Sequence, residues 1–424
     1  MENTLNNSPE SKKNTARDYN LIRILIALFL PYLALSVAQN GFLGLLPFIR
    51  DEFDLSRVQV GYYSTFFFIS ASFLSVFSGN IVDSFGPKKS ILLGIGSLGI
   101  LLSLQGLSSL YSVILILSFL SGLGFSIITP SATKAVMLAT PREKRAFSMG
   151  FTQSGFGMGG ILGASILPFL GEKMGWRAAV QIAAGAVLLT GLWVYKLYHD
   201  NENDKNTIHK PEDKKSKKDT FREHLSFIIA DKLLFRICFS GMLFGISEGA
   251  LLAHFVVFLT DDLMISKVAA GLNFAALHLG GMAGLLGWGF FSDRFFRIDR
   301  RFGIFLIGLS SGFIYLFFGL FVCRPFLNQI LVFFLSFLFG FLVLGWTGAY
   351  LTTVGEVAGE RHSGTATGLA LLFVRGAMIV SPPIFGLIAD INGSYRYSWL
   401  IYSFVIIGMS FLFLPLKKQP VVLT

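Results

Sequence analysis

Two matching stretches of the sequence decide the fold: Gly79-Asn80-Ile81-Val82-Asp83-Ser84-Phe85-Gly86-Pro87-Lys88-Lys89, which ends one long apolar segment, and Gly289-Phe290-Phe291-Ser292-Asp293-Arg294-Phe295, which ends another 210 positions later. Both have the pattern G-x-x-x-D and are followed by basic residues. Glycine lets one helix approach another closely, the aspartate lies at the membrane surface, and a basic cluster is typical of the cytoplasmic side. The recurrence predicts a membrane protein built from two similar halves.

The composition also indicates a membrane protein. Hydrophobic residues make up 53% of the 424 residues, charged residues only 14%, and the mean hydropathy is +0.65. A soluble domain has about 25% charged residues, so lipid must solvate most of this chain. The net charge of +10 does not indicate nucleic acid, because most Lys and Arg lie in short segments between apolar stretches. Cys238 and Cys323 lie in or beside apolar runs, so we expect no disulfide, metal site or cofactor.

Twelve apolar stretches are long enough to span the membrane, which takes about 20 residues. The fold expected is an all-α membrane protein of twelve transmembrane helices in two pseudo-symmetric six-helix bundles. The predicted spans are 22–43, 58–80, 90–108, 111–136, 146–170, 177–197, 234–258, 268–291, 303–322, 328–352, 364–388 and 397–416.

The basic residues predict the orientation. Most of the 35 Lys and Arg residues fall in one set of alternate loops, which includes both termini, so both termini are expected in the cytoplasm of a cell with this chain in its inner membrane. The expected organisation is a disordered tail, an N-terminal bundle, a linker, a C-terminal bundle and a second tail, over residues 1–20, 21–198, 199–230, 231–416 and 417–424. The lysine run in the linker is either a plain solvated segment or a lipid-binding one.

A second internal repeat supports the duplication. Span five ends with Pro168-Phe169-Leu170-Gly171 before Gly175-Trp176-Arg177, and span eleven ends with Pro383-Ile384-Phe385-Gly386 before Tyr395-Arg396. The spans therefore repeat as six plus six.

These features together resemble the major facilitator superfamily: twelve spans, a long central loop, the paired motif after spans two and eight, and Gly175-Trp176-Arg177 before span six. The resemblance extends over about residues 21–416. It implies a secondary transporter in which two six-helix bundles enclose a central cavity and rock to open it to alternate sides. Spans 1, 4, 7 and 10 would then line the cavity, and spans 2, 5, 8 and 11 would form the interface between the bundles.

The sequence also departs from patterns in the family. Ser84 stands in the first motif where the family often has a basic residue, and span four has Ser118, Ser121 and Gly122 in place of the Arg-x-x-Gln-Gly of proton-driven drug exporters. Drug/proton antiport through that arginine is therefore not expected. The stretch from Asp83 to Lys88 resembles the oxalate/formate and nitrate/nitrite porter branches, although span two lacks the arginine expected of nitrate porters.

Three ionisable groups lie deep inside predicted spans, where each costs about 2.5–3.5 kcal/mol unless it faces a cavity or a partner. Arg375 offers a planar fork of donors for an anionic substrate, or pairs structurally with Glu248 or a helix-end carbonyl. Glu248 either carries a proton or forms a permanent ion pair with Arg375. His278 either relays protons or bonds to substrate, or is a neutral histidine bonded to nearby backbone.

Neutral polar and aromatic groups complete the predicted substrate site. Gln39, Asn40 and Gln153 either bind substrate or join helices through ordinary hydrogen bonds, and Trp346 and Tyr350 either form a cavity wall or pack towards lipid.

The paired motif predicts a cytoplasmic gate that holds the bundles in the outward-facing state, made of Gly79, Asp83, Gly86, Lys88, Lys89, Gly289, Asp293, Arg294 and Glu356. Lys134 either extends to the membrane surface or faces the cavity. A glycine series in span five, from Gly155 to Gly163, is expected to face the opposite bundle.

The function expected is secondary active transport of a small organic or inorganic anion coupled to protons, by a monomer in the lipid bilayer. The alternatives are an exporter of neutral or hydrophobic compounds, and a sensor or assembly protein on a transporter frame. An enzyme is not expected, since the sequence has no nucleophile–base pair, metal-ligand cluster or nucleotide loop.

Overall fold

A computed structural model describes residues 9–141, 144–198, 229–295, 299–322 and 328–414. Residues 1–8 of the predicted N-terminal tail, residues 199–228 of the predicted linker and the whole predicted C-terminal tail, 417–424, lie outside these ranges. The helices of the first half are α1 (Pro9–Gly44), α2 (Leu46–Phe53), α3 (Arg57–Phe85), α4 (Pro87–Leu107), α5 (Tyr111–Ala139), α6 (Arg145–Met174) and α7 (Trp176–Leu197). Those of the second half are α9 (Lys232–Ser240), α10 (Met242–Asp261), α11 (Lys267–Phe295), α12 (Arg300–Phe317), α13 (Gln329–Leu344), α14 (Thr347–Asn392) and α15 (Arg396–Ser410).

The described residues form eleven helical segments long and apolar enough to cross a membrane, and the bent α3 makes a twelfth. Span seven consists of α9 and α10, and span ten of α13 and the start of α14, which is kinked at Gly359 before span eleven. The large apolar side chains exposed around the outside of the bundle suit contact with lipid. The prediction of an all-α protein with twelve spans is confirmed.

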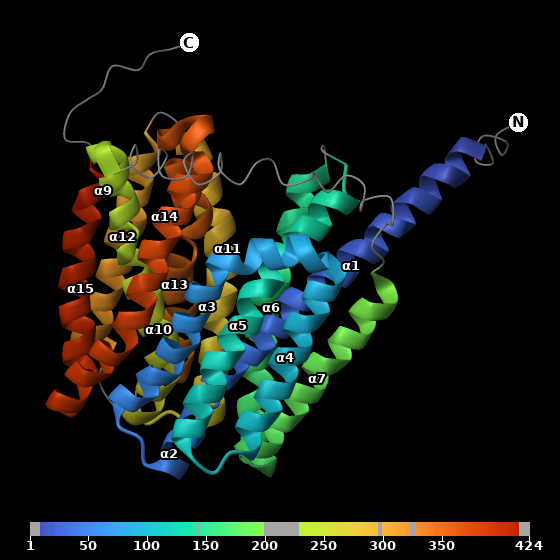
Figure 1. The fold of residues 1–424 in the computed structure, drawn as a ribbon. Helices are drawn as coiled ribbons and strands as arrows, with labels where there is room; N and C mark the ends of the chain where they lie inside the picture. The colour runs from blue at the N-terminus through green and yellow to red at the C-terminus, as the bar shows by residue number, and fades with distance from the viewer. Residues whose placement is uncertain (1–8, 142–143, 199–228, 296–298, 323–327, 415–424) are drawn as a thin grey trace, which may run out of the picture.

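The helices form two bundles that lie side by side (Figure 1). The N-terminal bundle contains α1 and α3–α7, and the C-terminal bundle contains α9–α15. Helix pairs in one have counterparts in the other: α1 packs on α6 as α10 packs on α14, α3 on α5 as α11 on α13, and α4 on α7 as α12 on α15. The predicted pseudo-symmetry is therefore present in the packing.

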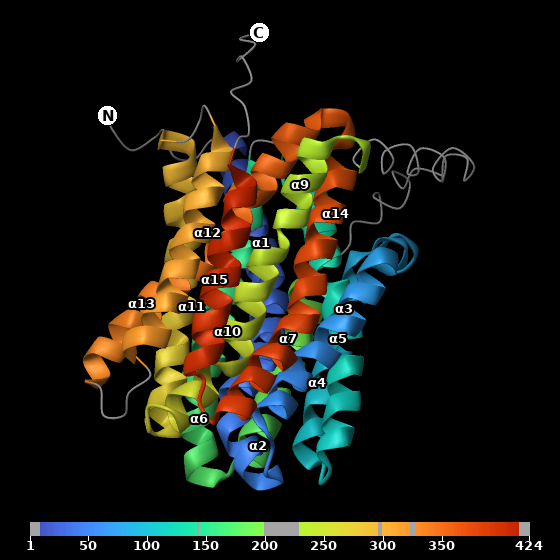
Figure 2. The same cartoon turned by 90° about the vertical axis from the view of Figure 1, so that its left-hand side faces the viewer.

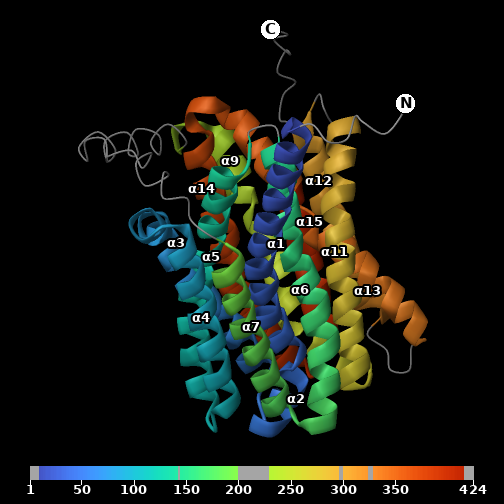
Figure 3. The same ribbon diagram turned by 90° about the vertical axis from the view of Figure 1, so that its right-hand side faces the viewer.

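Two ends of the molecule need names. The α2 end is the end at which α2 lies, and the terminal end is the opposite one, at which α1 begins and α15 ends (Figures 1 and 3). Helix α1 begins at Pro9, inside the stretch predicted as the N-terminal tail, so that residues 9–20 continue span one. Once a span is nucleated, extending it by good helix formers such as Lys and Ala adds one hydrogen bond per residue.

Backbone contact between glycines brings α1 and α6 together. An ideal Cβ at Gly163 would lie 2.9 Å from the Cα of Gly41, and one at Gly155 or Gly159 would crowd the carbonyls of α1. Three of the five span-five glycines therefore pack within their own bundle. Gly157 and Gly160 face the opposite bundle, against α11, so these two glycines of the series lie at the interface predicted for it, because a helix presents successive residues about 100° apart.

Near the terminal end α3 bends by 63° between Ser75 and Phe77, so that its last turns stand away from α14 (Figure 2). Serines accompany the bend: the hydroxyl of Ser75 donates to Ser72 O (2.7 Å) and that of Ser78 to Ser75 O (2.9 Å). Hydroxyls that bond back to helix carbonyls weaken the helical ladder and favour bending.

Candidate functional site between the bundles

Two pseudo-equivalent seams join the bundles, α3 with α14 and α6 with α11. In the first, an ideal Cβ at Gly61 would lie 2.7 Å from the carbonyl carbon of Pro382; in the second, 210 positions later, one at Gly271 would lie 2.6 Å from Ala164 O and from Pro168 Cγ. Pro382 and Pro168 have no N–H group. Each therefore leaves a carbonyl of the preceding helical turn without its usual donor, and the other bundle can contact this exposed backbone.

The first seam uses a freed carbonyl directly. Thr65 Oγ1 donates across the bundles to Ile379 O at 2.7 Å. In an unbroken helix that carbonyl would accept from the residue four positions later, which is Pro383 and has no N–H.

Glycines on the seam helices show where the contact ends. At Gly79, Gly150, Gly289, Gly364 and Gly368, all in the terminal half, an added Cβ would meet nothing within 4 Å. The seam contacts lie instead in the α2 half and near the middle of the helices. The bundles are therefore closed together at the α2 end and parted towards the terminal end.

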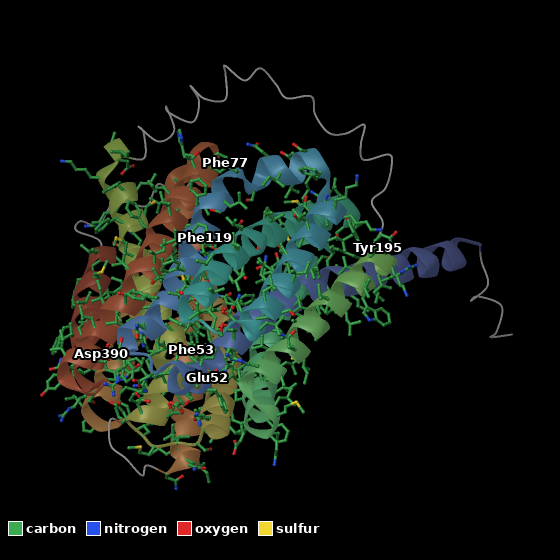
Figure 4. All side chains as sticks on the ribbon, turned by 60° about the horizontal axis from the view of Figure 1, so that its bottom comes forward. Glu52, Phe53, Phe77, Phe119, Tyr195 and Asp390 are labelled. Carbon is green, nitrogen blue, oxygen red and sulfur yellow. The ribbon has the colours of Figure 1, made fainter. Side chains whose placement is uncertain are left out.

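Charged side chains join the bundles at the α2 end. Lys267 of α11 pairs with Asp51 of α2, Arg50 of α2 pairs with Asp261 of α10, and the guanidinium of Arg57 lies 3.4 Å from the same Asp261. Figure 4 shows this end turned forward, with Asp390 of α14 and Glu52 of α2. Both oxygens of Asp390 accept backbone N–H groups from the first turn of α3, at 2.9 Å each.

This charge cluster was missed in the sequence, although a signal was present. The octapeptide Asp51-Glu52-Phe53-Asp54-Leu55-Ser56-Arg57-Val58 recurs 210 positions later as Asp261-Asp262-Leu263-Met264-Ile265-Ser266-Lys267-Val268. Both copies follow the first span of a bundle and lead into the second.

The structure brings together Glu248 and Trp346, from spans seven and ten. Trp346 Nε1 donates to Glu248 Oε2 at 2.9 Å, and the Trp346 ring stacks on Phe244 with 4.9 Å between centroids and 5° between planes. The Glu248 side chain is half-buried. The predicted permanent pair of Glu248 with Arg375 is wrong, because the carboxylate turns towards span ten rather than span eleven.

Both of these spans are broken, at Gly241 in span seven and at Gly345 in span ten. The Tyr350 hydroxyl lies 3.1 Å from Cys238 O and 3.3 Å from Ile237 O, the carbonyls beside the first break. A lipid-embedded break needs such donors, because no water is available there. Tyr350 therefore packs inside the C-terminal bundle and not towards lipid.

The second break is held in the same way from other helices. Trp288 Nε1 donates to Phe341 O at 3.1 Å, and Ser311 Oγ donates to Leu342 O at 3.0 Å. The two breaks place Glu248 beside Trp346 at the centre of the C-terminal bundle.

Arg375 lies on the face of α14 that contacts the N-terminal bundle. It precedes Ile379 and Pro382 by four and seven positions, so it shares their face, one turn beyond the Thr65 contact towards the terminal end. It is half-buried, and among the described residues its guanidinium has no ion pair or hydrogen bond. It is available for an anion.

His278 lies in the other seam. The ideal Cβ of Gly160 would be 2.9 Å from the ring atoms Cγ and Nδ1 of His278, and the ring also contacts Phe274. The side chain is 6% exposed, and Nε2 has no hydrogen-bond partner among the described residues. The alternative of a histidine bonded to nearby backbone is therefore wrong for Nε2. Aligning the repeats at Pro168 and Pro383 makes Gly160 the counterpart of Arg375, which sets His278 and Arg375 at one depth.

The three predicted amides are in different places. Asn40 is fully buried and donates to Ser36 Oγ at 2.9 Å, and Gln39 lines a small pocket inside the N-terminal bundle together with Tyr63 and Gln105. Gln153 alone is exposed. It lies four positions before Gly157 on the face of α6 that contacts α11, in the half where the bundles part.

The predicted gate residues form pairs within each bundle. Asp83 accepts from Lys134 at 2.7 Å, and Arg300 bridges Asp293 (2.8 Å) and Glu356 (3.0 Å).

In the conformation described, Asp83 pairs with Lys134 and not with Lys88 or Lys89 of its own motif. Lys88 lies over the Tyr195 ring at 4.8 Å, and Lys89 and Arg294 are exposed. Gly86, with φ of 79°, forms the turn between α3 and α4 that a larger residue would strain.

Comparison with known proteins gives concordant matches. The family model described as Major Facilitator Superfamily matches residues 24–382 and 237–423. The probable sulfoacetate transporter SauU of Cupriavidus necator is 26% identical over 370 residues, 84% of each chain. The membrane sensor protein UhpC of Escherichia coli is 23% identical over 379 residues, 85% of this chain and 84% of the sensor.

Among solved structures, a bacterial homolog of the human lysosomal transporter Spinster, in an inward-facing and occupied conformation, superposes with a TM-score of 0.72. The match covers 94% of this chain and 96% of that chain at 15% identity, and so concerns the fold alone.

Proposed function

The chain belongs to the major facilitator superfamily, and on that premise we propose that it is a secondary active transporter that carries a small organic anion with protons by alternating access. The superfamily fold is that of a transporter and not of an enzyme. The observation that carries the proposal is Arg375: a cation deep in a span, without a carboxylate partner among the described residues, on the face turned to the other bundle.

The anion would be held by the guanidinium fork of Arg375, and Gln153 would face the same opening from the N-terminal bundle, nearer the terminal end. A guanidinium presents paired N–H groups that match a carboxylate or sulfonate, and the surrounding apolar helices strengthen that attraction. The relative named for sulfoacetate supports an organic acid as the substrate class.

Glu248 would carry the proton. Its carboxylate accepts one hydrogen bond, from Trp346, and is half-buried between spans seven and ten, so that taking up a proton changes the charge of the site by one. His278, at the depth of Arg375, is the second candidate. When Glu248 is protonated and neutral, the positive charge of Arg375 would remain, and the negative charge of the substrate would balance it.

Alternating access would use the two ends of the seams. In the conformation described, the α2 end is closed and the terminal end parted. In the opposite conformation the motif residues around Asp83 and Asp293 would meet across the bundles, which is the gate role predicted for them. With both termini in the cytoplasm, as the charge bias predicts, the terminal end would face the cytoplasm, and the protein would act as a monomer in the inner membrane.

The test is anion uptake into proteoliposomes, with sulfoacetate and simple monocarboxylates as probes. Arg375→Ala is expected to lower uptake about 10- to 150-fold, the equivalent of a charged hydrogen bond worth about 1.5–3 kcal/mol, and Arg375→Lys to restore part of it. Arg396→Ala is the matched control, because Arg396 is exposed at the α2 end. Uptake that is equal in wild type and Arg375→Ala rejects the assignment.

A second candidate function is sensing, which the match to the membrane sensor UhpC favours. Binding of the same anions without flux in the proteoliposomes would support a sensor. Uptake of neutral compounds that is insensitive to Arg375→Ala would support the exporter alternative instead.

A further inference from the structure

The two octapeptides that start at Asp51 and Asp261 have the same local structure. Asp54 (φ 49°) and Met264 (φ 56°) are the positive-φ residues other than glycine in the described part of the chain, and they hold the same place in the repeat. The serine two positions later begins the next helix in both: Ser56 Oγ and Ser266 Oγ each accept a backbone N–H at 3.3 Å. Two loops of one shape therefore face each other at the α2 end.

The first acidic residue of each octapeptide binds the basic residue of the other. Asp51 pairs with Lys267, and Asp261 pairs with Arg57 at 3.4 Å. Because 51 corresponds to 261 and 57 to 267, the two ion pairs are reciprocal copies of one interaction across the pseudo-twofold axis. Each joins the N-terminal to the C-terminal bundle.

The second acidic residue binds mainly within its own bundle, although Arg57 also lies 3.8 Å from Asp262 across the bundles. Glu52 pairs with Arg177 at 2.8 Å and accepts from Trp176 Nε1, at the start of α7. Asp262 accepts from Ser394 Oγ (2.6 Å) and from the backbone N–H of Tyr395 (2.8 Å), at the start of α15.

The copy at Asp261 is the more buried one, so removing one partner leaves a buried charge unpaired. The side chains of Arg57 and Asp261 are 14% and 15% exposed, against 32% and 61% for Lys267 and Asp51, so water screens the Asp51 pair far more. Arg50 adds a second cation to Asp261.

Further contacts connect the more buried pair, Arg57 with Asp261, to the seam. Arg57 lies over the Tyr395 ring at 5.1 Å. Burial raises the pKa of the Tyr395 phenol well above its usual value, so the phenol stays protonated and donates to His254 Nδ1 at 3.1 Å. Pro382 O can only accept, so His254 Nε2 donates to it at 2.8 Å. The ion pair is thereby tied to the backbone that Gly61 contacts.

We propose that these reciprocal ion pairs are the latch of the α2 end: they hold it closed, and both must break for it to open. The partners of each pair lie on opposite bundles, so any separation at this end breaks both pairs together with the two bonds from Asp390 to α3. This inference rests on the proposed alternating access, and it names the interactions that oppose opening of the α2 end.

The test measures opening without any substrate. Spin labels at Met174→Cys and Ile391→Cys, both exposed near this end of α6 and α14, report the distance between the bundles in a background without the native cysteines. Asp261→Asn is expected to raise the ratio of long to short distances about 10-fold or more. Asp51→Asn is expected to raise it less than about fivefold, and Lys267→Asp with Asp51→Lys to restore it.

Glu52→Gln is the matched control. The substitution removes a negative charge next to Asp51, but Glu52 forms its ion pair within its own bundle. Distances equal to wild type in both Asp261→Asn and Asp51→Asn overturn the latch, and so does a shift in Glu52→Gln as large as that in Asp261→Asn. If Asp261→Asn does not fold, the exposed Asp51 pair decides alone. Opening without uptake of the anions would reject the substrate assignment and leave the latch standing.

Discussion

Two glycines of α11 are expected to respond in opposite ways to the same substitution, alanine. An ideal Cβ at Gly280 would overlap the carbonyl oxygen of Phe337 in α13, whereas one at Gly289 would meet nothing within 4 Å. In Gly280→Ala the backbones of two helices must move apart, which costs about 1–3 kcal/mol. In Gly289→Ala no contact is lost, and alanine favours the helix by about 1 kcal/mol over glycine.

Gly289 belongs to the motif proposed to close the terminal end in the opposite conformation. If that conformation needs the close approach of glycine, the new methyl group costs about 1–3 kcal/mol there and nothing in the conformation described here. The ratio of the two conformations then shifts by about 5- to 150-fold towards the one closed at the α2 end. Gly289→Ala is therefore expected to be at least as stable as wild type and to transport more slowly.

Two measurements on each variant check this. Thermal unfolding of the purified protein in detergent, followed by tryptophan fluorescence, should give a lower Tm for Gly280→Ala and an equal or higher Tm for Gly289→Ala. Uptake into proteoliposomes should fall for Gly289→Ala. If Gly289→Ala transports at the wild-type rate, the proposed role of Gly289 in the gate is refuted. If its Tm is as low as that of Gly280→Ala, the conclusion that a methyl group at Gly289 meets no neighbour is refuted.

Two further predictions concern the broken spans. Trp346→Phe keeps an aromatic ring on Phe244 but removes the hydrogen bond to Glu248, which is worth about 1.5–3 kcal/mol. Uptake driven by an imposed pH gradient should then fall towards the rate measured without a gradient. An unchanged response to the gradient would contradict the role of this bond. Tyr350→Phe removes a hydrogen-bond donor from the break in span seven and should lower the Tm, because the lost bond is worth about 0.5–1.5 kcal/mol. Tyr397→Phe, at an exposed position, should leave the Tm unchanged. Equal Tm values for the two variants would contradict the role of Tyr350 at the break.

The sequence by itself determined the twelve spans, the duplication and the family. Spans can be predicted because lipid requires about 20 apolar residues with every backbone group bonded inside the helix, a demand that each segment meets alone. The repeats at Asp83 and Asp293, and at Pro168 and Pro383, are equally visible in one dimension. The depth of Glu248, His278 and Arg375 follows from counting residues along a helix of known rise.

Only the tertiary structure decided which groups meet. Asp83 binds Lys134 of α5 and not the lysines beside it, and Glu248 binds Trp346 and not Arg375. Such choices depend on how each helix is rotated about its axis and on which end of the bundle pair is closed, and a uniformly apolar span carries little sign of either. The reciprocal ion pairs at the α2 end were missed for the same reason: each half of the contact lies about 210 positions from the other, and only folding the two halves against each other brings them together.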